Sequence, residues 1–255
     1  MIKIQCLTRK FGDKVAVDQI SLDVARGEII GLVGPNGAGK STTVKMLTGL
    51  LKPTSGSALI AGFDVVDAAI EVKKRIGYAP ESGALFESLS ALEYLEMVAQ
   101  LRHIDSDQAR KRINEFLDLF GIADEKHTQL SLFSKGMKQK TMLAAAFLHN
   151  PEVLFLDEPL NGLDASAALT IKKLLTKLAG QGKTIIFCSH IMEVVEKICT
   201  RIVIIDHGKI IASGNPAEIL AHANETTLEN AFNRLTNSSD SETASSELLQ
   251  ALQQS

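Results

Sequence analysis

The sequence predicts an α/β protein with a mostly parallel central sheet, and three observations support this fold class. Residues 28–33 form a nearly continuous apolar run that leads into a glycine-rich loop, as a strand buried on both faces would. Residues 152–157 form a second apolar run and end in acidic side chains. Between residues 90 and 150 the apolar spacing changes to the helical period, which predicts a helical insertion.

The amino-terminal segment predicts a small antiparallel β lobe in front of this core. Ile2, Ile4 and Cys6 alternate with polar neighbours, and residues 11–14 break the run as a hairpin turn does. After the glycine loop we expect a helix that begins at Ser41. The elements expected next are a turn over 53–56, a strand over 57–61, a helix over 66–76 and a strand over 75–79.

The helical insertion begins with a capping-box pattern, Ser90 followed by Glu93, and the predicted subdomain covers about residues 84–150. Further helices are expected over 107–120 and 134–148, followed by strands and helices over 152–157, 165–179, 183–188, 191–198 and 201–206. We expect one domain over residues 1–236. The polar stretch 237–255 has few apolar anchors and is predicted to be a flexible tail.

Composition narrows the functional classes. The formal net charge of −3 provides no global basic field, so we expect no nucleic-acid partner. The three cysteines lack metal-ligand spacing and indicate reduced thiols in a cytosolic protein. No apolar run approaches the ~18 residues of a membrane-spanning helix, and the first residues have no signal-peptide pattern. We therefore expect a soluble chain that reaches a membrane only through a partner.

Residues 34–41 match a phosphate-binding loop with a strand before it and a helix after it. Glycines in such a loop let successive backbone N–H groups turn toward phosphate oxygens. The Lys40 ammonium can reach the β- and γ-phosphates, and the Ser41 hydroxyl can coordinate Mg²⁺. A chance glycine turn is the alternative. The predicted nucleotide-binding residues of this segment are Gly34, Pro35, Asn36, Gly37, Ala38, Gly39, Lys40, Ser41 and Thr42.

Three further segments carry polar groups that suit the same chemistry. Asp157 ends a buried strand and suits a Mg²⁺ ligand, while Glu158 suits a general base for water; a solvated acidic pair is the alternative. Ser134 and Gly136 open a helix and can approach a phosphate, although alone they describe only an N-capped helix with a basic face. His190 also ends a strand, where a histidine is usually structural.

In this order and spacing the motifs resemble the ATP-binding subunit of ABC transporters, over about residues 1–215. The family signature Leu-Ser-Gly-Gly-Gln appears here with Phe133, Lys135 and Met137 replacing three of its residues. The resemblance implies a P-loop (RecA-like) core and the cofactors ATP and Mg²⁺. It also implies that Ser134 and Gly136 bind ATP held by a second subunit, which is either an identical chain or a paralogue.

The resemblance assigns roles to four further residues. His190 is similar to the switch histidine that contacts the γ-phosphate, and Asp164 belongs to a segment similar to the loop that crosses to the other subunit. Phe11 occupies the position that stacks on adenine, although a core position would suit it equally. Glu81 stands where most members have glutamine; its carboxylate keeps an oxygen ligand for the metal ion and adds a negative charge.

Glu81, the altered signature and residues 228–236 resemble the ABC-2 exporter subgroup. This resemblance implies a polytopic membrane permease as partner, bound near the Glu81 loop and the helical insertion at the cytoplasmic face of the cell membrane. Two alternatives remain from the sequence. One is an ABC-type ATPase that acts in a non-transport assembly, and the other is a generic P-loop kinase or GTPase, which leaves the signature and His190 unexplained.

Overall fold

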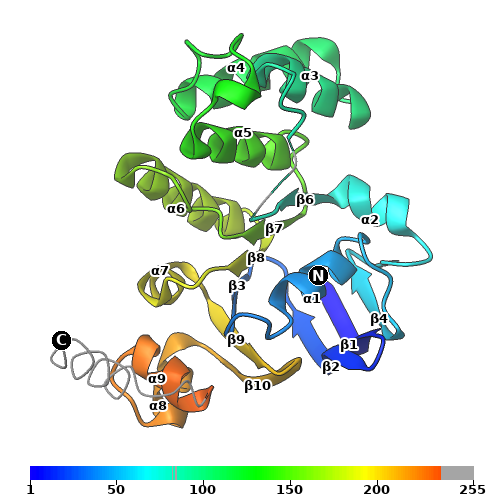
Figure 1. The fold of residues 1–255 in the computed structure, drawn as a ribbon, viewed down its shortest axis with the longest axis vertical. Coiled ribbons are helices and arrows are strands. Elements are labelled where there is room, and N and C mark those ends of the chain that lie inside the picture. The colour runs from blue at the N-terminus through cyan, green and yellow to red at the C-terminus, as the bar shows by residue number, and fades with distance from the viewer. Residues whose placement is uncertain (82, 84, 237–255) are drawn as a thin grey trace, which may run out of the picture.

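The structure is a computed structural model that describes residues 1–81, 83 and 85–236 (Figure 1). A six-stranded sheet runs through its centre in the order β10-β9-β3-β8-β7-β6. Neighbouring strands from β9 to β6 are parallel, and β10 is antiparallel to β9. The prediction of a mostly parallel core is confirmed. The strands are β3 (Ile29–Val33), β6 (Ile76–Ala79), β7 (Val153–Asp157), β8 (Thr184–Cys188), β9 (Arg201–Asp206) and β10 (Lys209–Gly214).

A second, antiparallel sheet confirms the predicted amino-terminal lobe. Its order is β2-β1-β4-β5, and its strands are β1 (Ile2–Phe11), β2 (Lys14–Val24), β4 (Ser55–Ile60) and β5 (Phe63–Asp64). The first two strands are longer than the short strands expected from the sequence. Irregularities in the β1–β2 register between Ile4 and Lys10 explain the difference, because they interrupt the apolar alternation within one continuous strand.

Alternating residues of the central strands feed two separate hydrophobic cores. Ile30 and Leu32 of β3 pack in the core shared with the antiparallel sheet and helix α1 (Lys40–Leu47). Ile29 and Val33 point to the opposite core, which the remaining long helices cover. A strand buried on both faces has no polar side to reveal a period of two, which is why these strands read as continuous apolar runs.

Helices α3 (Ala91–Leu101), α4 (Ser106–Leu119) and α5 (Lys135–Phe147) gather at one end of the molecule (Figure 1). Ser90 forms the predicted capping box with Glu93, with N···O distances of 3.2 and 2.8 Å. Ser134 caps α5 by accepting from the Met137 N–H at 3.2 Å. These contacts satisfy helix-end donors that would otherwise lack partners, and they fix where α3 and α5 begin.

The other helices are α2 (Ala69–Arg75), α6 (Ala165–Gly180), α7 (Met192–Ile198), α8 (Pro216–Ala223) and α9 (Leu228–Leu235). Helix α2 begins three residues later than expected, because the Asp64 carboxylate accepts from the N–H groups of Val66 and Asp67 and holds a turn there. Sequence analysis missed α8, although Asn215 and Glu218 form a capping box around a proline at its first turn. The predicted tail, 237–255, lies outside the described residues.

In the part of the chain that the structure describes, we find no helix with both the length and the apolar character of a membrane span. The longest helix in that part, α6, has 16 residues.

Gly77 is predicted to hold β6 against α5. A Cβ at this position would lie 2.2 Å from the Ala146 carbonyl oxygen, which is backbone and cannot rotate away. Gly77→Ala should therefore lower the free energy of unfolding by about 1–3 kcal/mol. Gly180→Ala is the matched control, because nothing lies within 4 Å of its added methyl group. Urea denaturation should show the control unchanged or slightly stabilised, and equal stability of both variants would contradict this packing.

Candidate nucleotide site

A cleft of about 690 Å³ lies where the carboxyl ends of β3, β7 and β8 meet the β1–β2 hairpin. Ligands of open α/β sheets bind at this edge, because loops there leave the strands in different directions. The cleft gathers most of the residues predicted from the sequence. Its lining comprises Phe11, Lys14, Ala16, Gly34, Asn36, Gly37, Ala38, Gly39, Lys40, Ser41, Thr42, Glu81, Asp157, Glu158 and His190.

The glycine loop connects β3 to α1 by a path that only small residues allow. A Cβ on Gly34 would lie 2.1 Å from the Ile205 carbonyl oxygen, and Gly39 adopts a φ of +109°. The Lys40 ammonium donates to the carbonyl oxygens of Gly34 at 2.5 Å and Pro35 at 3.0 Å. Pro35 thus contributes through its backbone and does not line the cleft itself. The arrangement places a lysine and the amino-terminal end of a helix together, which suits phosphate binding.

Asp157 is almost fully buried at the end of β7 and accepts a hydrogen bond from the Ser41 hydroxyl at 3.2 Å. Burial raises the pKa of Asp157, and the charges of Glu81 and Glu158 act in the same direction. The Ser41 hydrogen bond and the charge of Lys40 oppose the rise. A carboxylate in this environment gains from a nearby cation, because a positive charge would offset both desolvation and repulsion.

The oxygen donors of Ser41, Asp157 and Glu81 line the same cleft, and hydroxyl and carboxylate oxygens suit Mg²⁺. Within the described ranges, no three His, Cys, Asp or Glu side chains converge closely enough to hold a metal ion alone. Mg²⁺ keeps several waters and takes few carboxylates when phosphate groups supply the remaining ligands.

Glu158 follows Asp157 with a left-handed φ of +49° and donates its N–H to the Cys188 carbonyl oxygen at 2.9 Å. This backbone turn directs its side chain toward the end of β8. One carboxylate oxygen lies 2.9 Å from the His190 N–H and 2.8 Å from Nδ1 of the same residue, and the other accepts from the Ser189 hydroxyl at 3.4 Å. Glu158 is thus held in place, while the His190 side chain remains 70% exposed.

Phe11 lies at the edge of the cleft and is 47% exposed, which argues against the alternative of a core position. The Arg9 guanidinium stacks on its ring at 4.5 Å from the centroid. Sequence analysis missed Lys14 and Ala16, which line the cleft beside Phe11. The signal was available: both residues lie at the start of β2, and a hairpin brings the start of its second strand beside the end of its first.

Ser134, Gly136 and Asp164 do not line the cleft, and they gather instead where α5 meets the loop before α6. A Cβ on Gly136 would lie 2.4 Å from the Gly162 carbonyl oxygen, so the two backbones approach closely. Asp164 caps α6 by accepting from the Ala167 N–H at 2.8 Å and forms an ion pair with Lys140 at 3.3 Å. Both contacts lower the pKa of Asp164.

A phosphate-binding loop between a parallel strand and a helix, facing a strand-end Asp-Glu pair, defines the class of P-loop nucleotide-binding proteins. The model of the ABC transporter family matches residues 17–161 of the chain. The chain therefore belongs to the ABC transporter family.

Similar proteins agree with this assignment. An uncharacterized ABC transporter ATP-binding protein of Nostoc sp. is 42% identical over 212 residues, which cover 82% of this chain and 63% of that protein. The daunorubicin resistance ATP-binding protein DrrA3 of Streptomyces coeruleorubidus is 38% identical over 220 residues, covering 86% and 70%. The solved cassette MJ0796, a dimer in a post-hydrolysis state bound to ADP and Pi, is 27% identical with a TM-score of 0.78, covering 84% and 98%.

Asp157→Asn should stabilise the nucleotide-free chain at neutral pH. The wild-type carboxylate is charged there, and its burial makes that charge costly, as its raised pKa shows. We expect a melting temperature higher by roughly 2–4 °C. The advantage should shrink as the pH falls through the raised pKa, since the wild-type side chain then becomes neutral as well. Asp67→Asn, at an exposed position, should change little. A variant less stable than the wild type at neutral pH would refute this account of Asp157.

Proposed function

We propose that the chain is the ATP-binding and ATP-hydrolysing subunit of an ABC transporter, which powers a separate membrane permease through ATP-dependent dimerisation. The observation that carries this proposal is a single cleft that combines Lys40, Asp157, Glu158 and His190 with the glycine loop. The signature residues lie outside that cleft. The relatives' names support the transporter assignment, and the chain covers only part of the first of these proteins.

In the proposed site, the backbone N–H groups of the glycine loop and the Lys40 ammonium bind the phosphates of ATP. Phe11 offers an exposed aromatic face to adenine, and Arg9 behind the ring holds it in place. Ser41, Asp157 and Glu81 hold Mg²⁺, which when bound neutralises phosphate charge. Glu81 adds a third carboxylate to this region, and the metal ion offsets the charge that it brings.

Glu158 is proposed as the general base that orients and deprotonates the attacking water. Its carboxylate reaches the end of β8 and is positioned by His190 and Ser189. His190, exposed at the same edge, is placed to contact the γ-phosphate. Phosphoryl transfer requires mainly positioning and charge stabilisation, and these residues provide both.

A second subunit completes the proposed site. Ser134 and Gly136 lie at the start of α5, away from the cleft in the same chain, so they suit a phosphate held by another copy or a paralogue. The related cassette MJ0796 forms a dimer, which supports this arrangement. ATP then links the two subunits, and hydrolysis releases them.

The proposed permease partner is a polytopic membrane protein, and the chain is peripheral at the cytoplasmic face of the membrane. The exporter direction is supported by the similarity to a drug-resistance ATP-binding protein. No nucleic acid enters this proposal.

Glu158→Gln should trap an ATP-bound dimer. Glutamine keeps the size of the side chain and loses the base, so hydrolysis should fall by about 10²–10⁴-fold while ATP binding persists. Light scattering after gel filtration with ATP should show a dimer for this variant. Glu115→Gln, on the exposed side of α4, is the control and should hydrolyse ATP as the wild type does. Wild-type hydrolysis by Glu158→Gln would remove Glu158 as the base.

Lys40→Ala should weaken ATP binding by about 10–100-fold, because it removes the ammonium group closest to the phosphate loop. Isothermal titration calorimetry measures the affinity directly. Lys45→Ala changes an exposed lysine on the same helix outside the cleft and should bind ATP normally. Unchanged affinity in Lys40→Ala would contradict the assignment of the phosphate loop.

A further inference from the structure

A two-residue turn connects β9 to β10, and its tip lies beside β2 of the antiparallel sheet (Figure 1). The two residues, His207 and Gly208, have φ angles of +46° and +78°. Positive φ angles at both central residues define the type I′ hairpin turn, which glycine adopts without strain. Neither residue lines the nucleotide cleft, yet this turn contacts two of the segments that do.

On one side the turn bonds to the phosphate loop. The Gly208 N–H donates to the carbonyl oxygen of Ala38, which is buried within the loop, at 2.9 Å. Shortly before the turn, the Ile205 carbonyl oxygen lies against the start of the same loop, because a Cβ on Gly34 would be only 2.1 Å from it. The β9–β10 hairpin therefore contacts the phosphate loop at two points.

On the other side the turn bonds to strand β2. The Gly208 carbonyl oxygen accepts from the Asp18 N–H at 2.8 Å, and the Lys209 ammonium pairs with the Asp18 carboxylate at 3.3 Å. The ion pair is partly exposed and adds little stability, so the backbone hydrogen bond is the firmer contact. Ala16, two residues earlier on β2, lines the cleft together with Phe11. One glycine thus joins the phosphate side of the cleft to the side that carries the exposed aromatic ring.

Gly208 has little free space in the direction of β2. An added Cβ would lie 3.0 Å from the Ala16 carbonyl oxygen and 3.2 Å from the Val17 Cα. These are backbone atoms, so β2 itself would have to move by a few tenths of an ångström to make room. The three nearest atoms all belong to Ala16 and Val17, and the hydrogen bond to Ala38 lies on the opposite side. A side chain at this position would therefore displace β2 rather than the phosphate loop.

The phosphate loop and β2 also meet directly beside this turn. A Cβ on Gly39 would lie 2.5 Å from the Ala16 carbonyl oxygen and 3.6 Å from the Gly208 Cα. Three backbone segments therefore converge at one point, in contacts between main chains rather than flexible side chains. Parts of a protein that are packed this closely transmit a displacement from one segment to the next. A shift at the turn would thus change the distance between the phosphate loop and β2.

We propose that Gly208 is a positioning residue for nucleotide binding, which sets the distance between the phosphate loop and the wall of the cleft formed by Phe11 and Ala16. ATP contacts both sides at once, so a displaced β2 weakens the contact with the base while the phosphates stay bound. This inference rests on the proposed function, because it takes Phe11 to stack on adenine. It adds a residue outside the cleft on which that stacking depends.

The first measurement is the affinity of the full chain carrying Gly208→Asn for ATP, by isothermal titration calorimetry. Asparagine tolerates a left-handed φ, so this variant alters the contact with β2 more than the backbone of the turn. We expect the Kd for ATP to rise about five- to tenfold, which is part of the cost of losing a base–aromatic stack. A loss of folded protein would instead lower the binding stoichiometry and leave the Kd unchanged. An unchanged Kd would overturn the proposal.

Gly62→Asn is the matched control for this variant. Gly62 also connects two antiparallel strands, β4 and β5, with a φ of +87°, and nothing lies within 4 Å of an added Cβ. Its affinity for ATP should equal that of the wild type. Gly208→Ala, which adds the Cβ alone, should raise the Kd about two- to threefold and provides the measurement should the larger side chain prevent folding. An equal rise in Gly62→Asn would contradict an effect of the contact with β2.

A double-mutant cycle with Phe11→Ala shows whether Gly208 acts through the base. Phe11→Ala should itself raise the Kd for ATP, and Gly208→Asn should then add no more than about a factor of two. Additive effects would mean that Gly208 acts through the phosphate loop or through general stability, and would overturn the proposal.

The same cycle separates this inference from the proposed function. A Kd unaffected by Phe11→Ala would remove the proposed adenine contact and this inference with it. A raised Kd in Phe11→Ala together with a wild-type Kd in Gly208→Asn would remove this inference alone. The variants of Lys40 and Glu158 test phosphate binding and hydrolysis independently of both.

Discussion

The candidate site depends on the parallel pairing of β3, β8 and β7, in that order across the sheet. Register pairs of β3 with β8 and of β8 with β7 bring their carboxyl ends to one edge. The glycine loop follows β3, His190 follows β8, and the acidic pair ends β7. The Ser41 hydroxyl then bonds to Asp157 across the intervening strand, over a sequence separation of 116 residues. Without this pairing, none of the three polar segments would meet the others.

The same strand pairing also places carboxylates in buried positions, where water solvates their negative charge poorly. Asp157 ends a strand whose five residues are all buried, Glu158 follows it directly, and Glu81 lines the same cleft. The pKa of Asp157 rises chiefly because the carboxylate is buried, and the charges of Glu81 and Glu158 add to the rise, while Lys40 and the Ser41 hydroxyl oppose it only in part. The ionised Asp157 carboxylate is destabilised in the nucleotide-free chain, so a cation that binds together with phosphate groups would stabilise it. The cost at Asp157 is therefore consistent with metal-dependent nucleotide binding.

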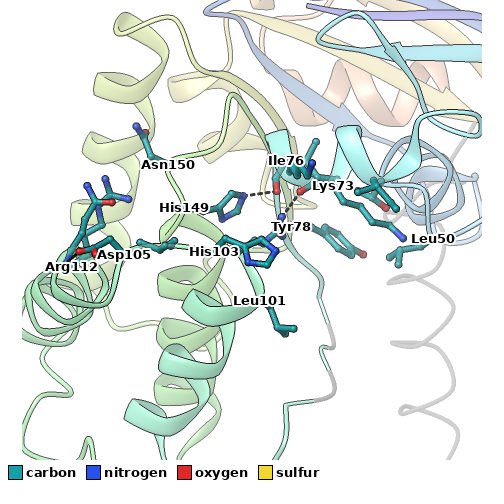
Figure 2. A pocket seen from close by; sticks show the side chains of 16 residues that line it. Leu50, Lys73, Ile76, Tyr78, Leu101, His103, Asp105, Arg112, His149 and Asn150 are labelled. Atoms are coloured by element: carbon teal, nitrogen blue, oxygen red, sulfur yellow. Dashed lines mark hydrogen bonds between the residues drawn. The ribbon is translucent and has the colours of Figure 1, made fainter.

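Most of the core could be predicted from local signals, because short stretches of sequence determine buried parallel strands, helix caps and glycine turns. The capping box at Ser90 and the cap at Ser134 are examples. Contacts between distant segments could not be predicted in this way. Lys14 joins the nucleotide cleft only because the hairpin folds over it, and the hydrogen bonds from His190 to Glu158 require the left-handed turn at Glu158. The hollow between α2 and the α3–α4 turn could not be predicted either, because its lining side chains come from separate helices (Figure 2).

Strand β6 connects the nucleotide cleft to a second hollow, which lies between α2 and the α3–α4 turn, within a few residues. Ile76 and Tyr78 line this second hollow, and Glu81 lines the cleft just beyond the end of the strand. Burial and the charge of Asp157 raise the pKa of Tyr78 to about 12, so the phenol lies close enough to interact electrostatically with the Asp157 carboxylate. Helix α5 packs directly against this strand at Gly77, where an added Cβ would lie 2.2 Å from the Ala146 carbonyl oxygen. The two hollows are therefore joined by one short and tightly packed element, so a displacement of the strand on one side must be felt on the other.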